Sequence, residues 1–592
     1  MIVHRARELG FGYLEKMIRR VAIALLFAAS SLAAQPAEEP AKVELDRDRQ
    51  EHIWRIEHVT FLIEHYFGKP FSKKLMARDG EALRTYFREG FNGTRPARDA
   101  DESRGVGLVT ETRRSAKTSA SRPLDVAGAV EHLLGYVQGF DRVNRSKTQV
   151  LFLDPHPERE GAWVAVMMLS AVGVDPEGAP IEHLSEHRLE LYYEGEEEAL
   201  KKPGPIIARL DVQLEVERRA PQMLMQEVTA ETGIAEIPLP DNWNLTSNLA
   251  RVHRYQFAVE DYDGDGWLDI AVAATNGRIL LLRSQGGERF EDVAAAVGLK
   301  TLERPPGERM QKSLVGWIDL DNDGDPDLIA GTRLFRNDDG ERFVEITRAS
   351  GLKFELSPFG TVVADYDGDG LLDLYIVNQK GFKPRGPGKR PWVGDEEAGT
   401  SNDLWRNLGG GKFEDVSVEA GAGGGRHQTF AGVSFFLDED AHPDLYLAND
   451  FGENVLLRNR GDGSFADVTE RSGTGDFATS MGVTAGDLDN DGRSELYVAN
   501  MYSKMGRRIV AHIRPEYYPD GLYEMIQGSL AGNRLYRPST EPGRFDDITQ
   551  GLGVNKVGWA FAPAMADLDG DGWLDIYATT GYYSTDREKP DG

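Results

Sequence analysis

One stretch of nine residues decides the fold of this chain: Asp261-Tyr262-Asp263-Gly264-Asp265-Gly266-Trp267-Leu268-Asp269. Its carboxylates stand at positions 1, 3, 5 and 9, and a glycine at position 6 permits the sharp turn that folds the early aspartates inward. Calcium takes roughly six to eight oxygen ligands and accepts irregular geometry. The stretch therefore predicts a calcium site whose ligands are Asp261, Asp263, Asp265, Asp269 and the backbone carbonyl oxygen of Trp267.

The residues on either side of this loop predict strands. Residues 255–259 and 268–273 are rich in β-forming side chains and partly alternate in polarity. The helix-flanked type of calcium loop differs, because it requires an acidic ligand at its twelfth position. We therefore expect the ion to lie in a β-hairpin.

Related loops return five more times before the end of the chain, and four of them keep the acidic pattern. The ligands expected in these four loops, counting the backbone carbonyl of each seventh residue, are Asp319, Asp321, Asp323, Asp325 and Asp327; Asp365, Asp367, Asp369, Leu371 and Asp373; Asp487, Asp489, Asp491, Arg493 and Glu495; and Asp567, Asp569, Asp571, Trp573 and Asp575. The remaining loop, 436–444, has Phe436 at position 1 and Ala441 in place of the glycine. We expect weak or no calcium binding there.

A single Asp-x-Asp-Gly turn fits an ordinary β-turn with solvated carboxylates as well as it fits a metal site. Turn chemistry needs one aspartate and one glycine, whereas five of the loops combine intact early positions with an acidic ninth position. Calcium coordination explains that ninth position. The sequence therefore predicts about five Ca²⁺ sites and one degenerate loop.

Two further phrases accompany the loops from about residue 221 onward. One is of the type Phe-x-Asp-Val-Thr, as at 465–469, and the other is of the type Leu-x-Arg-Asn, as at 456–459. With the hairpin around each loop they form a repeating unit of four short strands, which is typical of β-propeller blades. The count favours six blades, with seven as the alternative. Because one strand follows the last loop, we expect 222–229 to supply the outer strand of the last blade.

The bulk composition bounds the function. At 592 residues the chain is long enough for two or more domains. Its net charge of −29 argues against nucleic-acid binding, which requires clustered Lys and Arg. The absence of cysteine excludes a disulfide framework and thiolate–metal chemistry.

The first residues predict export from the cytoplasm. Arg19 and Arg20 precede an apolar run at 21–29 and then small residues, which together indicate a signal peptide over 1–34 with Met17 as the true start. A membrane anchor is the alternative, but the run is well short of the ~20 residues that span a bilayer, and no other run approaches that length. We therefore expect a secreted, periplasmic or cell-surface protein with no transmembrane span after signal removal.

A linker at 35–50 and a smaller α+β domain at 51–220 are expected before the propeller at 221–592. Helical spacing indicates helices at 53–67, 79–91 and 125–140, the last capped by Asp125, with a polar, basic interruption at 97–122. The strands expected after them, as an antiparallel meander, are 150–153, 163–174, 187–193 and 206–216. This order resembles nuclear-transport-factor-like folds. The spacing of His132, His156, His183 and His187 fits no metal-ligand pattern, so we expect surface or core roles for them.

The loops and phrases resemble FG-GAP/VCBS repeats, the calcium-loop propeller units also found in the head of integrin alpha chains, over roughly 221–592. Asn-Met-Tyr-Ser-Lys-Met-Gly at 500–506 and Val-Gly-Trp-Ala-Phe at 557–561 further resemble bacterial ASPIC/UnbV-type repeat proteins. That family usually continues into a C-terminal domain, which we expect to be lacking here. The resemblance implies an extracytoplasmic, calcium-stabilised propeller.

Two functions follow as hypotheses. The first is a calcium-binding propeller that acts as a binding or adhesion module for a protein or glycan. The alternative is an extracytoplasmic carbohydrate-active enzyme, a lyase or hydrolase built on the propeller. The absence of His-Glu-x-x-His, Gly-x-Ser-x-Gly and Walker motifs disfavours the enzyme, and no catalytic residue is assigned.

A few residues outside the loops are candidates for contact with a ligand, although a loop that covers one propeller face is the simpler interpretation. They are His427 and, in an insertion at 505–527, Arg507, Arg508, His512, Tyr517 and Tyr518. A basic, Gly- and Pro-rich insertion at 381–401 could contact an acidic partner. The tripeptide Arg460-Gly461-Asp462 occurs where the other repeats have turns, so we interpret it as a turn.

Overall fold

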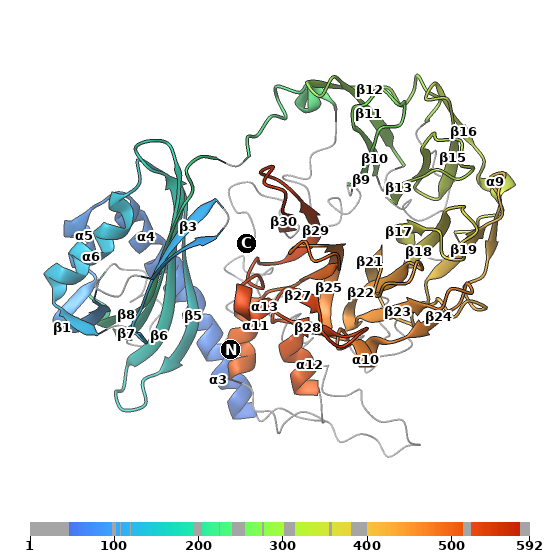
Figure 1. Ribbon diagram of the computed structural model, residues 1–592. Coiled ribbons are helices and arrows are strands. Elements are labelled where there is room, and N and C mark those ends of the chain that lie inside the picture. Colours follow the sequence, from blue (N-terminus) through green and yellow to red (C-terminus); the bar gives the residue numbers. More distant parts are fainter. Residues whose placement is uncertain are drawn as a thin grey trace, which may run out of the picture. The chain divides into compact units, whose positions relative to one another are not determined.

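The computed structural model shows two compact units (Figure 1). It describes residues 47–97, 102–106, 108–118, 120–192, 204–223, 225–238, 255–274, 277–300, 314–354, 358–379, 399–512 and 522–580. Of the described residues, those within Glu44–Glu227 and Arg508–Ile513 form the N-terminal unit, and those within Val228–Arg507 and Arg514–Gly592 form the propeller unit. The sequence did not predict that Arg508–Ile513 would join the N-terminal unit. The predicted signal peptide, nearly all of the linker and most of the 381–401 insertion lie outside the described residues.

The N-terminal unit begins with helices. They are α3 (Arg47–Leu62), the π-helical turn η2 (Ile63–Gly68), α4 (Lys69–Met76), α5 (Gly80–Arg84) and α6 (Val126–Gln138). Helix α6 begins where predicted, because the Asp125 carboxylate accepts the Gly128 N–H at 2.7 Å. The predicted helix 79–91 was wrong in its second half: α5 ends at Arg84, and Phe87 begins a strand that pairs with the sheet.

Eight strands of this unit form one sheet, with β1 to β4 before α6 in the chain and β5 to β8 after it. They are β1 (Phe87–Pro96), β2 (Glu102–Val106), β3 (Val109–Ser115), β4 (Ser121–Leu124), β5 (Arg142–Pro155), β6 (Ala162–Val174), β7 (Pro180–Tyr192) and β8 (Ile207–Arg219). Their order is β2-β3-β8-β7-β6-β5, and β1 pairs with β4 and β8. Strands β5 to β8 form the predicted antiparallel meander. Helices and sheet share one core, which includes Ile56, Phe67, Leu133 and Leu189.

The polar stretch predicted to interrupt this unit contains strands instead. Its charges pair across the sheet: Glu111 on β3 accepts from Arg104 on β2 at 2.9 Å and from Arg218 on β8 at 2.8 Å. Cross-strand ion pairs thus replace the apolar alternation on which the prediction relied.

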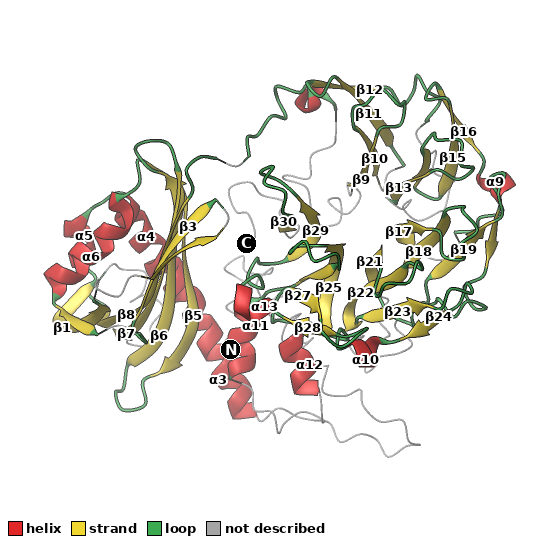
Figure 2. Ribbon diagram, viewed as in Figure 1, coloured by secondary structure: helices red, strands yellow, loops and turns green. Residues whose placement is uncertain are grey.

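Short strands make up most of the regular secondary structure of the propeller unit (Figure 2). The first blade consists of β9 (Tyr255–Glu260), β10 (Asp269–Ala274), β11 (Ile279–Gln285) and β12 (Arg289–Asp292). The second consists of β13 (Val315–Ile318), β14 (Asp327–Ala330), β15 (Arg333–Asp338) and β16 (Arg342–Glu345). The third consists of β17 (Pro358–Ala364), β18 (Asp373–Asn378), β19 (Asp403–Asn407) and β20 (Phe413–Asp415). The fourth consists of β21 (Thr429–Phe435), β22 (Asp444–Glu453), β23 (Val455–Asn459) and β24 (Phe465–Asp467). The fifth consists of β25 (Phe477–Gly486), β26 (Glu495–Asn500), β27 (Arg534–Pro538) and β28 (Phe545–Asp547). The sixth contains β29 (Ala560–Ala566) and β30 (Asp575–Thr580).

We number these blades 1 to 6 in chain order. Their first strands β9, β13, β17, β21, β25 and β29 pack successively against one another. The described residues thus contain six blades, the favoured number. Blades 4 and 5 are fused into one sheet, because the end of β22 pairs with the start of β25.

Short helices complete the described part of this unit. They are η4 (Ile234–Glu236), α9 (Thr347–Ser350), α10 (Thr469–Ser472), α11 (Lys504–Ala511), α12 (Leu522–Gly528) and α13 (Thr549–Leu552). The part of α11 from Arg508 onward belongs to the N-terminal unit. Helices α9, α10 and α13 follow the outer strands of blades 2, 4 and 5, and each ends at a left-handed glycine. No helix among the described residues is long and apolar enough to cross a membrane.

The segment 222–229 does not complete the last blade as predicted. Its described residues form no strand, and blade 6 contains β29 and β30 in the described part of the chain. The chain instead continues beside blade 1, where the Phe290 N–H on β12 donates to the carbonyl oxygen of Thr232 at 2.9 Å.

Candidate metal centres

Each acidic loop joins the first and second strands of a blade, as predicted. In blade 1, Glu260 pairs with Asp269 directly behind the loop. The first carboxylate closes the turn: Asp261 accepts the N–H groups of Asp265 at 3.1 Å and Gly266 at 2.9 Å. The glycines at position 6 all have φ between 87° and 94°, a region that disfavours other residues: Gly266, Gly324, Gly370, Gly492 and Gly572.

The predicted side-chain ligands come together in four of the loops. Carboxylate oxygens lie within 4.8 Å of one another in these groups: Asp261, Asp263 and Asp265; Asp319, Asp321 and Asp327; Asp365, Asp367 and Asp369; and Asp487, Asp489 and Glu495. In the loop of blade 6, Asp567 accepts the N–H groups of Gly570, Asp571 and Gly572, which gives it the same turn.

Several of these carboxylates have a buried oxygen with no hydrogen-bond donor among the described residues. The position 3 side chains Asp263, Asp321 and Asp489 each have such an Oδ1 atom, and Asp319 at position 1 has another. Burial and the neighbouring Asp265 raise the pKa of Asp263, and burial and Asp323 do the same for Asp321. A cation would satisfy these oxygens and offset the repulsion, so the residues fit a bound Ca²⁺.

The ninth-position carboxylates have a structural role that the sequence analysis missed. Asp327 accepts the N–H of Leu320, the second loop residue, at 2.9 Å and the N–H of Asn337 on β15 at 2.7 Å. Asp269 and Asp373 make the equivalent pair of bonds. Burial raises the pKa of Asp327 to about 7. These carboxylates tie each loop to the third strand of its blade, which is a second reason for an acidic ninth residue.

The seventh residues were expected to coordinate through their carbonyl oxygens, and that role stays a prediction. The structure shows the N–H groups of these residues bound to the position 5 carboxylates, each at 2.9 Å. The donors are Trp267, Asp325, Leu371, Arg493 and Trp573, and the acceptors are Asp265, Asp323, Asp369, Asp491 and Asp571.

A positive side chain from the third strand of blade 4 pairs with the carboxylates of the degenerate loop 436–444. Arg458 on β23 donates to Asp438 at 2.9 Å and to Asp440 at 3.0 Å. Burial raises the pKa of Asp438, but hydrogen bonds and the charge of Arg458 outweigh it, so the net pKa is lowered. Asp444 keeps the ninth-position bonds, to the N–H groups of Leu437 and Asn459 at 2.8 Å each. An arginine thus occupies the charge-balancing role that a cation would have.

The equivalent arginines of other blades show whether an arginine also neutralises the loop carboxylates there. Arg336 pairs with Asp338 and Arg406 with Glu414, both outside the loops. In blade 5, by contrast, Arg537 contacts Asp489 and Glu495 at 3.2 Å each. The 487–495 loop therefore combines an intact acidic pattern with partial internal neutralisation.

The asparagine of the Leu-x-Arg-Asn phrase links neighbouring loops. Asn337, Asn407 and Asn459 each donate through Nδ2 at 2.8 Å to the second residue of the preceding blade's loop. The acceptors are the carbonyl oxygens of Tyr262, Leu320 and Tyr366. Blade 5 has Pro538 at this position, and there the β22–β25 pairing makes the connection to blade 4.

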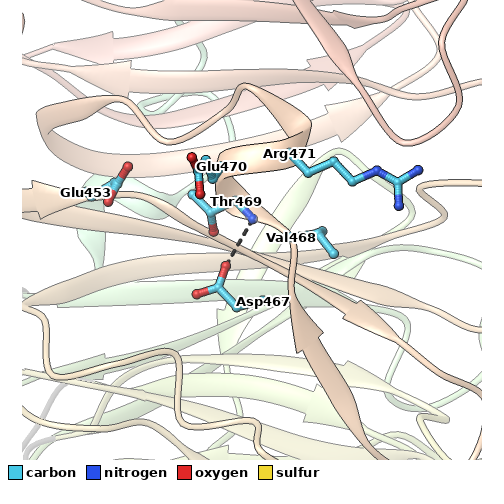
Figure 3. Close-up of a pocket in the computed structure, with 6 residues that line it drawn as sticks. All are labelled: Glu453, Asp467, Val468, Thr469, Glu470 and Arg471. Atoms are coloured by element: carbon cyan, nitrogen blue, oxygen red, sulfur yellow. Dashed lines mark hydrogen bonds between the residues drawn. The ribbon is translucent and has the colours of Figure 1, made fainter.

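The Phe-x-Asp-Val-Thr phrase also has a side-chain role. Asp467 accepts the N–H of Thr469 at 3.0 Å, and Thr469 Oγ1 accepts the N–H of Leu456 on β23 at 2.9 Å. Figure 3 shows the surface hollow at this turn, which is lined by Glu453, Asp467, Val468, Thr469, Glu470 and Arg471. Asp467 and Thr469 in this hollow are hydrogen-bonded within the turn, so we interpret the hollow as part of the blade's structure and not as a ligand site.

The other candidates have mixed outcomes. Arg508 and His512 belong to the N-terminal unit, Arg507 is exposed beside Tyr502, and His427 forms a β-bridge with Thr400. Tyr517 and Tyr518 lie outside the described residues. The tripeptide 460–462 lies in a turn between β23 and β24, closed by a bond from the Arg460 N–H to the Ser464 carbonyl oxygen.

Comparison with known proteins identifies the repeats. A model of the FG-GAP-like repeat matches residues 261–330, 319–376, 437–498 and 519–578. The chain contains FG-GAP-like repeats. The first matched FG-GAP segments begin at Asp261 and Asp319, the first ligand positions of the loops in blades 1 and 2.

The chain has curated relatives of low identity. It is 26% identical to human cartilage acidic protein 1 over 407 residues, which is 59% of either chain. It is 22% identical to the Xenopus tropicalis protein of the same name over 403 residues, 59% of this chain and 60% of the relative. The match therefore spans about three-fifths of the relatives' length.

Solved structures match weakly. One is an Agrocybe aegerita lectin described as recognising non-reducing terminal N-acetylglucosamine, with a TM-score of 0.32 at 14% identity, covering 81% of this chain and 96% of the lectin. Another is BBS1N in complex with ARL6DN, with a TM-score of 0.23 at 10% identity, covering 61% of this chain and 90% of that one. Neither contributes to the functional argument.

Proposed function

We propose that this FG-GAP repeat protein is an extracytoplasmic, calcium-binding β-propeller that serves as a binding module for a protein or glycan. The observation that carries the calcium proposal is the set of buried carboxylate oxygens without donors on Asp263, Asp321 and Asp489. Bound calcium would supply positive charge at these points. The chain's part is to hold the carboxylates together through the position 1 turn and the ninth-position bonds.

Location outside the cytoplasm agrees with this chemistry. Calcium sites of extracellular modules have dissociation constants of roughly 0.1 to 1 mM, which are filled only where calcium is abundant. The signal-like N-terminal sequence supports the same location.

Exposed aromatic side chains on the loops support the binding role. Trp267 is 48% exposed and Trp573 is 50% exposed, and both stand at position 7 of intact loops. Large aromatic side chains are enriched at binding surfaces, because they supply contact area at little entropic cost. We assign the ligand contact to the face that these loops form.

Calcium stoichiometry tests the metal part of the proposal. Equilibrium dialysis of the full chain is expected to give about five ions per molecule, and Asp321→Asn is expected to remove one. Asp438→Asn, in the loop that Arg458 neutralises, is the matched control and should leave the number unchanged. Binding of no calcium by the folded chain would refute the proposal.

The binding part is tested with an array of glycans and extracellular matrix proteins, probed with calcium and with chelator. We expect calcium-dependent retention that Trp267→Ala and Trp573→Ala weaken, while substitution of the exposed Val418, outside the loops, does not. Release of unsaturated products from an acidic polysaccharide would instead support the enzyme hypothesis.

A further inference from the structure

A second kind of ligand cluster, made of other residues than the acidic loops, lies in the N-terminal unit. His52 on α3, Asp154 near the end of β5 and His512 directly after α11 each present one ligand atom, and these three atoms lie within 4.8 Å of one another. His512 belongs to the segment Arg508–Ile513, which is part of this unit although it follows His52 by more than four hundred positions. Three distant parts of the chain thus converge on one point.

The geometry suits a small divalent ion. His52 Nε2 and Asp154 Oδ1 are 3.5 Å apart, and the rings of His52 and His512 meet edge to face with centroids 5.8 Å apart. Neighbouring ligand atoms of a tetrahedral zinc ion are separated by about 3.4 Å, given metal–ligand bonds of about 2.0 to 2.1 Å. One pair is already at that separation, and the third atom lies within 4.8 Å of both.

The surroundings hold His512 firmly while leaving a route for an ion. His512 is 5% exposed, and Phe152 stacks on its ring at 5.6 Å with an interplanar angle of 19°. The side chains of His52 and Asp154 are 31% and 41% exposed. The cluster therefore has an anchored inner ligand and two outer ligands that solvent can reach.

The same three elements are joined by a buried ion pair next to the cluster. Arg508 on α11 donates to both carboxylate oxygens of Glu57 on α3, at 2.7 Å each, and to the carbonyl oxygen of Val150 on β5 at 2.6 Å. Both ionic side chains are 6% exposed. A bidentate, buried contact of this kind fixes orientation as well as distance. It fixes the elements that carry His52, Asp154 and His512, as the surroundings of a metal site do.

We propose that His52, Asp154 and His512 bind a divalent transition-metal ion of the zinc class. Two imidazole nitrogens and one carboxylate oxygen form a borderline ligand set that suits Zn²⁺ and Co²⁺, whereas Ca²⁺ requires oxygen ligands. The three side chains leave a fourth position open to water. A bound ion would tie the segment Arg508–Ile513 to α3 and β5, and this site is distinct in chemistry from the loops.

The test uses the full chain, stripped of metals and then kept in excess Ca²⁺ so that the loops are satisfied. Co²⁺ is titrated while visible absorption is recorded, and Zn²⁺ is titrated by calorimetry. We expect one saturable site, visible ligand-field bands for Co²⁺ and displacement of Co²⁺ by Zn²⁺. His52→Gln, Asp154→Asn and His512→Gln should each weaken Zn²⁺ binding by more than about 10-fold.

The control is His156→Gln. His156 lies just beyond β5, its Nδ1 accepts the Glu158 N–H, and it is not part of the cluster. It should bind Zn²⁺ and Co²⁺ as the parent does. Circular dichroism and the calcium-dependent melt establish that each variant is folded. The proposal is overturned if the folded parent binds neither metal, or if the three ligand variants bind as well as His156→Gln.

Discussion

Arg458 shows how one residue can replace a bound ion. Its guanidinium pairs with Asp438 and Asp440 in the loop that lacks the acidic first position and the turn glycine. Three substitutions would restore the pattern of the other loops: Phe436→Asp, Ala441→Gly and Arg458→Leu. We expect this triple variant to bind one more Ca²⁺ than the parent, as measured by equilibrium dialysis.

The matched control for that gain is Arg336→Leu. Arg336 occupies the same place in blade 2 but pairs with Asp338 outside the loop, so its loss should leave the calcium stoichiometry unchanged. A folded triple variant that binds no additional ion would contradict the assignment of Arg458 as the internal counter-charge.

His187 makes the stability of the N-terminal unit depend on pH. It is fully buried, and burial lowers the pKa of His187 from 6.5 to about 4. The Nε2 atom of His187 lies 3.2 Å from the Tyr136 hydroxyl, which also contacts His132 at 2.8 Å. Because the unfolded chain protonates first, stability is full above pH 6.5 and falls as the pH decreases toward 4, by about 3 kcal/mol.

Denaturant unfolding at a series of pH values measures this effect. His187→Gln removes the titration, so the difference in unfolding free energy between parent and variant should shrink as the pH falls from 6.5 to 4. A difference that is constant across that range would show that His187 does not contribute the pH dependence.

Residue types alone predicted which carboxylates gather: positions 1 and 3 come together in four loops, and position 5 or position 9 is the third member of each group. They could not predict the ninth-position role. Asp327 reaches both Leu320 and Asn337, and its second partner lies on another strand, so that contact depends on how β14 and β15 pair. The arginine in loop 436–444 was missed for the same reason.

At the level of elements, the asparagine bridges connect each loop to the next blade. Asn407 Nδ2 donates to the carbonyl oxygens of Leu320 and Leu372, and the side chain is fully buried. Asn407→Ala leaves both acceptors buried, and the loss of such a bond costs about 1 to 3 kcal/mol. We expect a lower melting temperature and weaker calcium binding by the loop that contains Leu320.

Asn144, which is exposed in the N-terminal unit, provides the control for that measurement. Asn144→Ala should leave both the melting temperature of the propeller and the calcium affinity unchanged. If Asn407→Ala lowers stability but not calcium affinity, the bridge is a packing contact that does not couple to the loop.

Blade hairpins were predictable because loop, strand and phrase lie within one local repeat. Elements that depend on distant pairing were not. Helix 79–91 gives way to β1 because Phe87 pairs with Ile207, more than a hundred residues away. The described residues of 222–229 form no strand, and Thr232 after them bonds to Phe290 on β12. A local sequence pattern does not indicate which distant segment a strand will pair with.

For the whole molecule, the largest surprise is the segment Arg508–Ile513. Its sequence follows the second strand of blade 5, yet it belongs to the N-terminal unit, where Arg508 forms a buried pair with Glu57. Removing one partner of a buried ion pair costs about 3 to 5 kcal/mol of stability, so this pair holds the segment strongly. The residues around the segment in the sequence predict only a loop on the propeller. Chain order therefore gives an incomplete account of which residues fold together.

The last prediction concerns calcium and the stability of the whole chain. If each of five loops binds with a dissociation constant of about 0.1 mM, then ~1 mM Ca²⁺ stabilises the folded state by about 1.4 kcal/mol per loop. Because the asparagine bridges join neighbouring loops, these contributions should act on one cooperative transition. We expect calorimetry to show a rise in the propeller's melting temperature on the order of 10 °C over the chelated protein.

Magnesium at the same concentration is the control, since it accepts irregular oxygen cages poorly and should raise the melting temperature much less. An unchanged melt after chelation would show that the loops hold together without an ion, through the ninth-position bonds alone.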